Sequence, residues 1–168
     1  IPSGYKPTKL YSVLPTPSYG SEEVTNGDFS NGSTDWDTSA SGTSSVVFTD
    51  VATLNIDGSN SNVGIYQQNV FSSGKKYKVS ARMKASANFE VEIIESQGAS
   101  LESVIASNIA LTTSYQDFTF YHTAIGTNDI FVHRLFSASG ANESIIVDNV
   151  SVQEVLVSDA DFDVSRAS

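Results

Sequence analysis

Side chains that could do acid–base or metal chemistry are plentiful in this sequence, but they form no recognised catalytic motif. Nineteen acidic residues are spread over 168 positions, and the chain has no cysteine. The two histidines, His122 and His133, are isolated and make no zinc set at a recognised spacing. No nucleophile elbow, phosphate loop or H-E-x-x-H motif occurs. Distant carboxylates can converge in space, as in glycosidases, but no pair is marked here, and we predict no catalytic residue and no enzymatic activity.

Several polar and aromatic residues are candidates for ligand binding, because they alternate with apolar residues in strand-like segments. Successive side chains of a strand point to opposite faces of the sheet. Residues opposite the apolar positions therefore lie on an exposed face, which could bind a ligand or could be an ordinary solvated surface. The candidates chosen by this parity are Tyr66, Gln68, Arg82, Tyr121 and His133.

The net charge of −10 disfavours free nucleic acid as a partner, since phosphate binding needs a basic surface. No run of about 20 apolar residues is present, so no membrane-spanning helix is predicted. The basic residues are nonetheless clustered, and the cluster either faces an acidic partner or is the solvated face of one strand. Five of the nine basic residues form it: Lys75, Lys76, Lys78, Arg82 and Lys84.

A hairpin would neutralise part of that cluster within the chain. If the segment 75–85 paired with the strand that follows it, Arg82 would lie opposite Glu92. Lys84 would then lie opposite Glu90. Each such cross-strand pair contributes a few tenths of a kcal/mol, so this arrangement favours the solvated-face interpretation.

The elements that must position these residues are strands, because apolar residues recur with a period of two almost everywhere. In "KKYKVSARMKA", for example, Tyr77, Val79 and Met83 alternate with charged residues. Glycine- and serine-rich turns separate the segments, and no long helical pattern occurs. We therefore predict an all-β fold, an antiparallel β-sandwich. The candidate strands are 51–57, 63–71, 75–85, 89–95, 103–109, 115–122, 129–136 and 144–156.

The two ends of the chain differ from the middle. Residues 1–21 contain all four prolines, which block regular strand pairing, so this segment is predicted to be extended. Residues 157–168 are short and acidic. Neither end can form a core alone, and we expect their apolar side chains to dock onto another subunit. Those side chains are Tyr5, Leu10, Tyr11, Val13, Leu14, Phe162 and Val164.

The stretch "VTNGDFSNGSTDW" ends in the only tryptophan of the chain, Trp36. Its ring is either a platform on which a sugar stacks or a core residue that closes one end of the sandwich. The same stretch, together with "IYQQNVFSSGKKYKVSARMKA" and "IIVDNVSVQEV", resembles the carbohydrate-binding modules of the family 4/9/22 type. The resemblance covers residues 22–156 and implies a jelly-roll sandwich. It also implies a structural place for Trp36, with Asn26-Gly27-Asp28 turning the chain into the sandwich.

Asp148 shares strand parity with Ile146, Val150 and Val152, so its carboxylate is predicted to point toward the core. A buried carboxylate needs either N–H donors or a cation. The family resemblance implies a structural calcium bound by this aspartate, by backbone oxygens near Asn26-Gly27 and by an acid at a position that is Ser30 here. Asp28 and Asp57 could supply the missing carboxylate, since calcium accepts varied oxygen ligands. A hydrogen-bonded Asp148 without metal remains the alternative.

The ends carry a second resemblance. "GYKPTKLYSVLP" and "DFDVSRAS" are similar to the amino-terminal region of tailed-phage fibre and appendage proteins, in which the two motifs lie close together. Here a sandwich would be inserted between them, and more chain would follow residue 168. Insertion is easy where a domain's termini lie close together.

The sequence therefore predicts three parts: an attachment segment over 1–21, a sandwich over 22–156 and a C-terminal segment over 157–168. The expected function is that of a structural component of a phage virion, a head or tail fibre or appendage. It would be assembled in the bacterial cytoplasm and bound to capsid, portal or tail subunits and to sister copies. The alternative is a module that binds host or environmental glycan through the concave sheet face.

Overall fold

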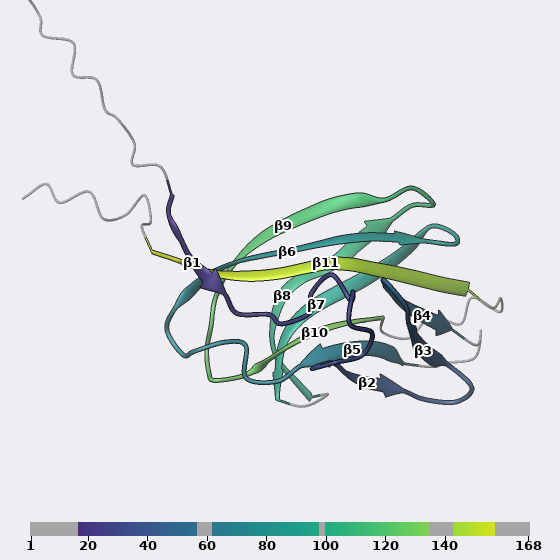
Figure 1. Ribbon diagram of the computed structural model, residues 1–168, viewed down its shortest axis with the longest axis horizontal. Helices are drawn as coiled ribbons and strands as arrows, with labels where there is room; N and C mark the ends of the chain where they lie inside the picture. The colour runs from purple at the N-terminus through teal and green to yellow at the C-terminus, as the bar shows by residue number, and fades with distance from the viewer. Residues whose placement is uncertain (1–16, 57–61, 98–99, 135–142, 157–168) are drawn as a thin grey trace, which may run out of the picture.

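The computed structural model describes residues 17–56, 62–97, 100–134 and 143–156. These residues form eleven strands and no helix, so no described helix could cross a membrane. The strands build two antiparallel sheets that pack face to face as a jelly-roll β-sandwich (Figure 1), which confirms the predicted fold class. The strands are β1 (Tyr19–Glu22), β2 (Asp37–Ala40), β3 (Ser45–Phe48), β4 (Ala52–Ile56), β5 (Val63–Gln67), β6 (Lys76–Ala85), β7 (Phe89–Gln97), β8 (Ser100–Leu111), β9 (Gln116–Thr123), β10 (Asp129–Arg134) and β11 (Glu143–Val155).

The first sheet, sheet A, has the strand order β3-β4-β11-β6-β9, and β1 also pairs with β11. The second, sheet B, has the order β2-β5-β10-β7-β8. Apolar side chains at alternate positions of both sheets meet between them. On β6 the predicted inward residues Tyr77, Val79 and Met83 are at most 1% exposed. The period-two pattern of the sequence therefore located the core strands.

Three short strands were not predicted, namely β1, β2 and β3. The first of them changes a boundary, because β1 begins at Tyr19, inside the segment predicted to be a separate attachment arm. Tyr19 lies opposite Val155 of β11, and the Leu156 N–H donates to the Ser18 carbonyl at 2.9 Å. The sandwich therefore begins before residue 22, and its first and last strands lie together at one end (Figure 1).

The expected hairpin between 75–85 and the next strand does not form. β6 pairs with β11 and β9 in sheet A, whereas β7 belongs to sheet B. Arg82 consequently lies opposite Asp148 on one side and Asp117 on the other, and not opposite Glu92. The predicted pairing of Lys84 with Glu90 is wrong for the same reason. The connection therefore crosses between the sheets, and the basic side chains of β6 face away from β7.

A bulge in β11 explains why the parity argument for Asp148 was wrong. The register of β11 against β6 shifts between Asp148 and Ser151, and Asn149 has a φ of 49°. Val147 and Val150 both point into the core as a result, whereas Asp148 is only half-buried. Its carboxylate accepts hydrogen bonds from the backbone N–H and the side-chain amide of Asn149, at 2.8 and 3.1 Å.

The opening loop packs directly onto this bulge. The Val150 N–H donates to the Gly27 carbonyl at 2.9 Å. A Cβ atom added to Gly27 would lie 2.0 Å from the Val150 carbonyl oxygen, so only glycine fits here. Further along, the Glu22 carboxylate accepts hydrogen bonds from the Val152 N–H and the Ser151 hydroxyl, both at 2.6 Å. The opening loop and the last strand are thus joined by direct hydrogen bonds.

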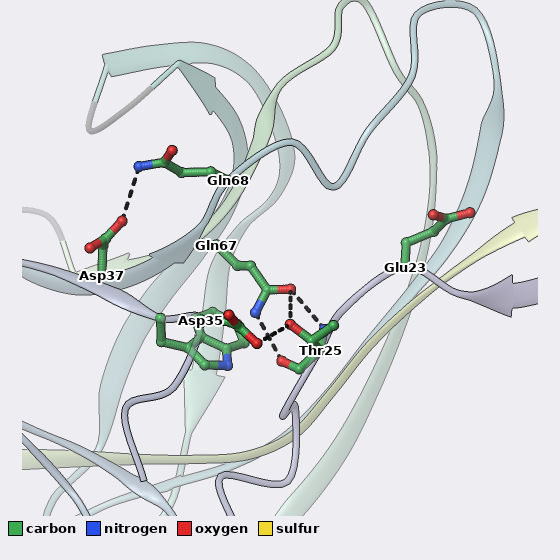
Figure 2. Close-up of a pocket in the computed structure, with 7 residues that line it drawn as sticks. Glu23, Thr25, Asp35, Asp37, Gln67 and Gln68 are labelled. Carbon is green, nitrogen blue, oxygen red and sulfur yellow. Dashed lines mark hydrogen bonds between the residues drawn. The ribbon is translucent and has the colours of Figure 1, made fainter. Parts of the chain in front are cut away.

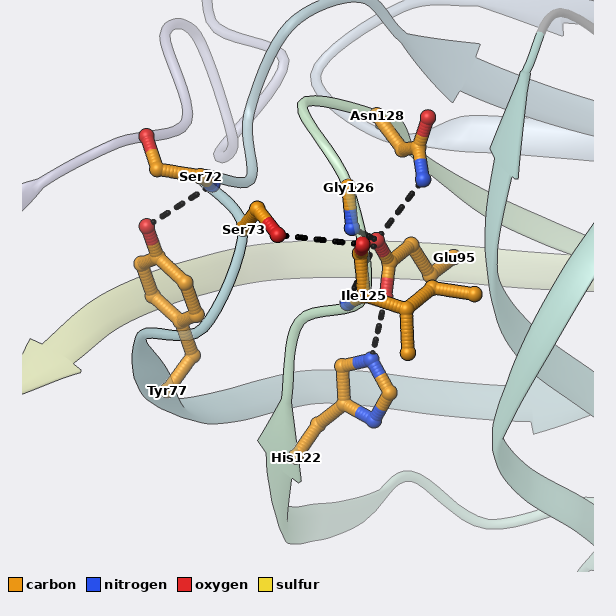
Figure 3. Close-up of polar contacts among 8 residues, drawn as sticks. All are labelled: Ser72, Ser73, Tyr77, Glu95, His122, Ile125, Gly126 and Asn128. Carbon is orange, nitrogen blue, oxygen red and sulfur yellow. Dashed lines mark hydrogen bonds and ion pairs between the residues drawn. The ribbon is translucent and has the colours of Figure 1, made fainter.

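Glu95 of β7 forms a buried polar link between the two sheets (Figure 3). Its side chain is completely buried, and one oxygen lies 2.6 Å from Nε2 of His122 on β9. The N–H groups of Ile125 and Gly126 and the amide of Asn128 also donate to it, at 2.8–3.1 Å. Burial raises the pKa of Glu95, but the hydrogen bonds from His122, Ile125, Asn128 and Gly126 outweigh burial and leave the pKa below its ordinary value.

The substitution Glu95→Gln tests this link. The side-chain NH2 group of glutamine would lie against the backbone N–H groups, so hydrogen-bond donors would oppose each other. We therefore expect the free energy of unfolding at pH 7 to fall by about 3 kcal/mol. Because the folded pKa of Glu95 is lowered, its stabilising effect is present above pH 4.5 and is lost as pH falls through the folded pKa. Urea unfolding at pH 7 and at pH 3 measures both effects. Glu90→Gln, at an exposed position of the same strand, is the control. Equal stability of the two variants at pH 7 would contradict this role for Glu95.

Gly27→Ala tests the contact between the opening loop and the bulge. We expect a loss of about 2 kcal/mol in urea unfolding, because the loop must move away from the Val150 carbonyl. Gly20→Ala is the matched control, since its nearest neighbour would lie at 3.4 Å, an ordinary contact. A stability loss no larger for Gly27→Ala than for Gly20→Ala would show that the loop shifts freely.

Candidate functional site

The outer face of sheet B, the face that points away from the core, carries a row of apolar and aromatic side chains across the middle of the sheet. Phe131 of β10 lies opposite Tyr66 of β5 on one side and opposite Ile94 of β7 on the other. Ile94 lies opposite Val104 of β8, which is 45% exposed. The Tyr66 ring meets the Phe131 ring edge-on, with centroids 5.8 Å apart. This contact holds the half-buried tyrosine ring in a fixed position.

His133 lies beside this row and is almost fully buried. Its ring stacks on Phe131 with centroids 4.4 Å apart. Both side chains crowd Gly64, where an added Cβ would lie 2.5 Å from Cβ of His133 and 2.5 Å from Cε2 of the Phe131 ring. Nε2 of His133 has no hydrogen-bond partner in the described part of the chain, and the nearest carboxylate oxygen, that of Glu92, is 3.8 Å away. Burial lowers the pKa of His133 to about 4, so its ring is neutral at pH 7.

An open hollow of about 470 Å³ adjoins this face where β5 ends and β2 begins (Figure 2). Gln67 forms its floor: its amide donates to the Thr25 carbonyl and its oxygen accepts from the Thr25 N–H, at 2.9 and 2.8 Å. Gln68 lies at the rim and donates to Asp37 at 3.0 Å. The lining residues are Glu23, Thr25, Asp35, Trp36, Asp37, Gln67 and Gln68.

The hollow is acidic, since Glu23, Asp35 and Asp37 line it and none of the lining residues in the described part of the chain is a lysine or an arginine. Asp37 lies opposite Tyr66 in the β2–β5 pairing, so one residue of the hollow neighbours the aromatic row. Burial, together with the charges of Asp37 and Asp129, raises the pKa of Tyr66. Its phenol is therefore protonated at neutral pH and available to donate a hydrogen bond to an oxygen of a ligand.

The structure separates the five predicted ligand-face residues into two groups. Tyr66 and His133 lie on the outer face of sheet B, and Gln68, which follows β5, lies at the rim of the hollow. Arg82 and Tyr121 lie on the outer face of sheet A, so the prediction of one shared face is wrong for these two. His133 is 6% exposed, so the expected exposed face does not include it, and parity within a strand does not tell which sheet the strand joins.

Sequence reasoning missed most of the hollow. Gln67 shares strand parity with the core residues Val63 and Ile65, so the pattern does not mark it as a ligand residue, yet its buried amide holds the opening segment in place. Glu23, Asp35 and Asp37 are ordinary surface acids when read along the chain. Their proximity follows from the folding of the opening loop, which the side chain of Asn26 organises by bonding to Gly32, Thr34 and Asn31.

Trp36 is a core residue, as the structural interpretation of the sequence predicted. It is 5% exposed, its ring lies 5.2 Å from that of Phe29, and its Nε1 donates to the Asn26 carbonyl at 3.0 Å. The indole therefore forms part of the wall of the hollow and offers no open platform. His122, which looked isolated in the sequence, is the partner of buried Glu95.

The described residues do not assemble the expected calcium site. No group of three or more histidine or acidic side chains among them could share a metal ion. The Asp28 carboxylate accepts from the N–H and the hydroxyl of Ser30, which hold its pKa below the ordinary value. Asp148 is bonded to Asn149, and the Gly27 carbonyl is bonded to Val150. Asp57 lies outside the described residues, and calcium stays a prediction.

The predicted docking residues also lie outside the described part of the chain, and their role stays a prediction. They are Tyr5, Leu10, Tyr11, Val13, Leu14, Phe162 and Val164.

Comparison with known proteins finds no matching family model and no matching curated sequence. Solved structures do match. The N-terminal cellulose-binding domain of Cellulomonas fimi β-1,4-glucanase C has a TM-score of 0.62 and 19% identity, over 80% of this chain and 97% of that one. The CBM22-1 xylan-binding domain from Paenibacillus barcinonensis has a TM-score of 0.60 and 11% identity, over 83% and 97%.

The enzymatically active domain of bacteriophage CBA120 tailspike protein 4 also matches, with a TM-score of 0.56 and 17% identity. The match covers 80% of this chain and 21% of the tailspike chain. At these identities the similarity establishes the fold and nothing finer. The chain has the jelly-roll sandwich of carbohydrate-binding modules of the CBM4 and CBM22 type.

Proposed function

We propose that the chain is a non-catalytic module that binds a neutral, hydroxyl-rich glycan at the hollow and at the adjoining outer face of sheet B. The observation that carries the proposal is the acidic hollow of about 470 Å³ beside the half-buried ring of Tyr66. Its volume lies within the range of about 300–1,000 Å³ that is usual for ligand sites. The cellulose-binding and xylan-binding domains that share the fold support this ligand class.

Tyr66 supplies the apolar contact. The C–H groups of a pyranose ring complement an aromatic face, and a tyrosine combines such a face with a polar hydroxyl. The edge-on contact with Phe131 already restricts the Tyr66 ring. Little side-chain freedom is then lost when a sugar binds, which lowers the cost of association.

The rim supplies the hydrogen bonds. Glu23 and Asp37 present carboxylate oxygens that can accept from sugar hydroxyls, and the Gln68 amide can donate or accept. Charged acceptors form stronger hydrogen bonds than neutral ones. The same carboxylates would repel an anionic sugar, since no cation lines the hollow among the residues that the structure describes. The site is therefore suited to neutral glycans.

The variant Tyr66→Ala tests this site. We expect its affinity for cellohexaose or for a xylan oligosaccharide to fall at least about ten-fold, because it loses the stacking face and a hydroxyl. Isothermal titration calorimetry measures the change, and urea unfolding verifies that the variant is folded. Tyr121→Ala is the control, since that tyrosine lies on the other sheet. Failure of the unmodified protein to bind any glycan of a broad neutral array would overturn the proposal, as would equal losses in the two variants.

A second candidate function is that of a phage virion component, a head or tail fibre or appendage assembled in the bacterial cytoplasm. Two observations favour it: the likeness to a phage tailspike domain and the pairing of Tyr19 with Val155. That pairing brings the two ends of the sandwich together, as insertion between neighbouring motifs requires. The terminal segments would bind capsid, portal or tail subunits and sister copies.

Truncation distinguishes the virion role from a free glycan-binding role. A chain reduced to residues 17–156 should keep its thermal unfolding midpoint and its glycan affinity but should not be incorporated into particles. Immunoblots of purified particles, compared with particles assembled from the full chain, measure incorporation. Incorporation of the truncated chain at the full level would contradict docking through the terminal segments.

A further inference from the structure

The outer face of sheet A carries a row of cations that the proposed function does not use. Lys76, Lys78, Arg82 and Lys84 alternate with the buried residues of β6, so all four project from the same face. Neighbouring members two residues apart are separated by about 6.6 Å, and the whole row extends over about 26 Å. We call these four residues the cationic row. They represent four of the nine basic residues in a chain with a net charge of −10.

Tyrosine rings flank the cationic row on both sides and at both ends. Lys78 Nζ lies 5.0 Å from the ring centre of Tyr19, and Lys76 Nζ lies 5.8 Å from that of Tyr121. At the other end, the Arg82 guanidinium and Lys84 Nζ lie 4.9 and 4.3 Å from the ring centre of Tyr115. The hydroxyls of Tyr19 and Tyr121 lie 3.1 Å apart. Cation–π contacts therefore hold the flexible cations near fixed positions.

The cationic row is not neutralised within the described residues. None of its four members has a carboxylate oxygen within 4 Å there, whereas the neighbouring Lys75 forms an ion pair with Glu154 at 2.7 Å. Asp117 and Asp148 are the acids opposite the row, both beside Arg82. Asp148 is bonded to Asn149, and Glu22, the acid on β1, is bonded to Ser151 and Val152. Among the residues that the structure describes, no carboxylate forms an ion pair with either end of the row.

We propose that the outer face of sheet A is a second carbohydrate site, which binds a linear polysaccharide with carboxylate groups along its length. A straight row of cations matches anionic groups that repeat along an extended chain. Between the charged ends, Ser80 and Thr119 lie opposite each other and offer hydroxyl groups to the sugar backbone. Tyr19, Tyr115 and Tyr121 add partly exposed ring surface on either side. This inference goes beyond the proposed function, since it concerns the opposite face and the opposite charge.

A polyuronate fits the cationic row better than a nucleic acid does, because the two polymers differ in charge density. A nucleic acid carries a phosphate on every nucleotide, and the protein's other acidic surfaces would repel such a dense polyanion over about 8 Å at physiological salt. A polyuronate carries weaker acceptors and many hydroxyl groups, which suit a row mixed with serine, threonine and tyrosine. Binding of an acidic peptide is the alternative that the experiment must exclude.

The test measures binding of polygalacturonate to the full chain by calorimetry in 20 mM and in 200 mM salt. Lys78→Gln should weaken binding about three-fold, and the double variant Lys78→Gln/Lys84→Gln about ten-fold, since each exposed charge contact contributes modestly. The control Lys75→Gln removes the same charge outside the row and should change the affinity less than two-fold. Higher salt should weaken binding by the unmodified chain and have a smaller effect on the double variant.

Three results would overturn the proposal. The first is no binding of polygalacturonate at 20 mM salt. The second is an equal loss in Lys75→Gln and Lys78→Gln, which would reflect net charge and not a site. The third is equal or tighter binding of polyglutamate or of single-stranded DNA of matched charge. Tyr66→Ala should bind polygalacturonate normally, so failure of the neutral-glycan site and failure of this one are distinguished by different variants.

Discussion

The buried carboxylate of Glu95 is the constraint on which the sandwich depends. Apolar contact between two sheets is non-directional and tolerates sliding, whereas a charge without water must be met by donors at fixed positions. Glu95 receives those donors from the other sheet, through His122, and from the turn that follows it, through Ile125, Gly126 and Asn128. The carbonyl of Asn128 in this turn accepts a hydrogen bond from the backbone N–H of Phe71, which lies in the loop between β5 and β6. The relative placement of sheets A and B is therefore set by one carboxylate as well as by the core.

That placement gives the molecule two unlike faces. The outer face of sheet B combines a fixed tyrosine with carboxylates and amides, and the outer face of sheet A combines cations with tyrosines. The difference arises from topology, because β6 enters sheet A while β7 crosses to sheet B. Had the two strands formed a hairpin, Arg82 and Lys84 would have met Glu92 and Glu90. The crossing leaves the acids and the bases of adjacent strands on opposite sides of the protein.

Much of the fold could be predicted from the sequence, because burial imposes a period of two on each long strand. The inward residues of β4 and β6 follow that rule. The short strands β1, β2 and β3 escaped prediction because four polar or mixed residues give too little pattern. The bulge at Asn149 reversed the orientation of Asp148, and one inserted residue leaves no mark in composition. The hollow could not be predicted from the sequence, because Gln67, Asp35 and Asp37 come together only through the loop that Asn26 organises.

The antiparallel pairing of β1 with the end of β11 has a mechanical consequence. Tyr19 and Val155 are neighbours, so tension applied at the two ends of the sandwich acts at one point and across the strand pair. Such a load peels hydrogen bonds apart one after another, whereas a load along the strands would stretch all of them together. The Leu156–Ser18 contact would yield first, then the short β1 ladder, while the core between the sheets stays intact. The chain would therefore lengthen under small forces before the sandwich core begins to unfold.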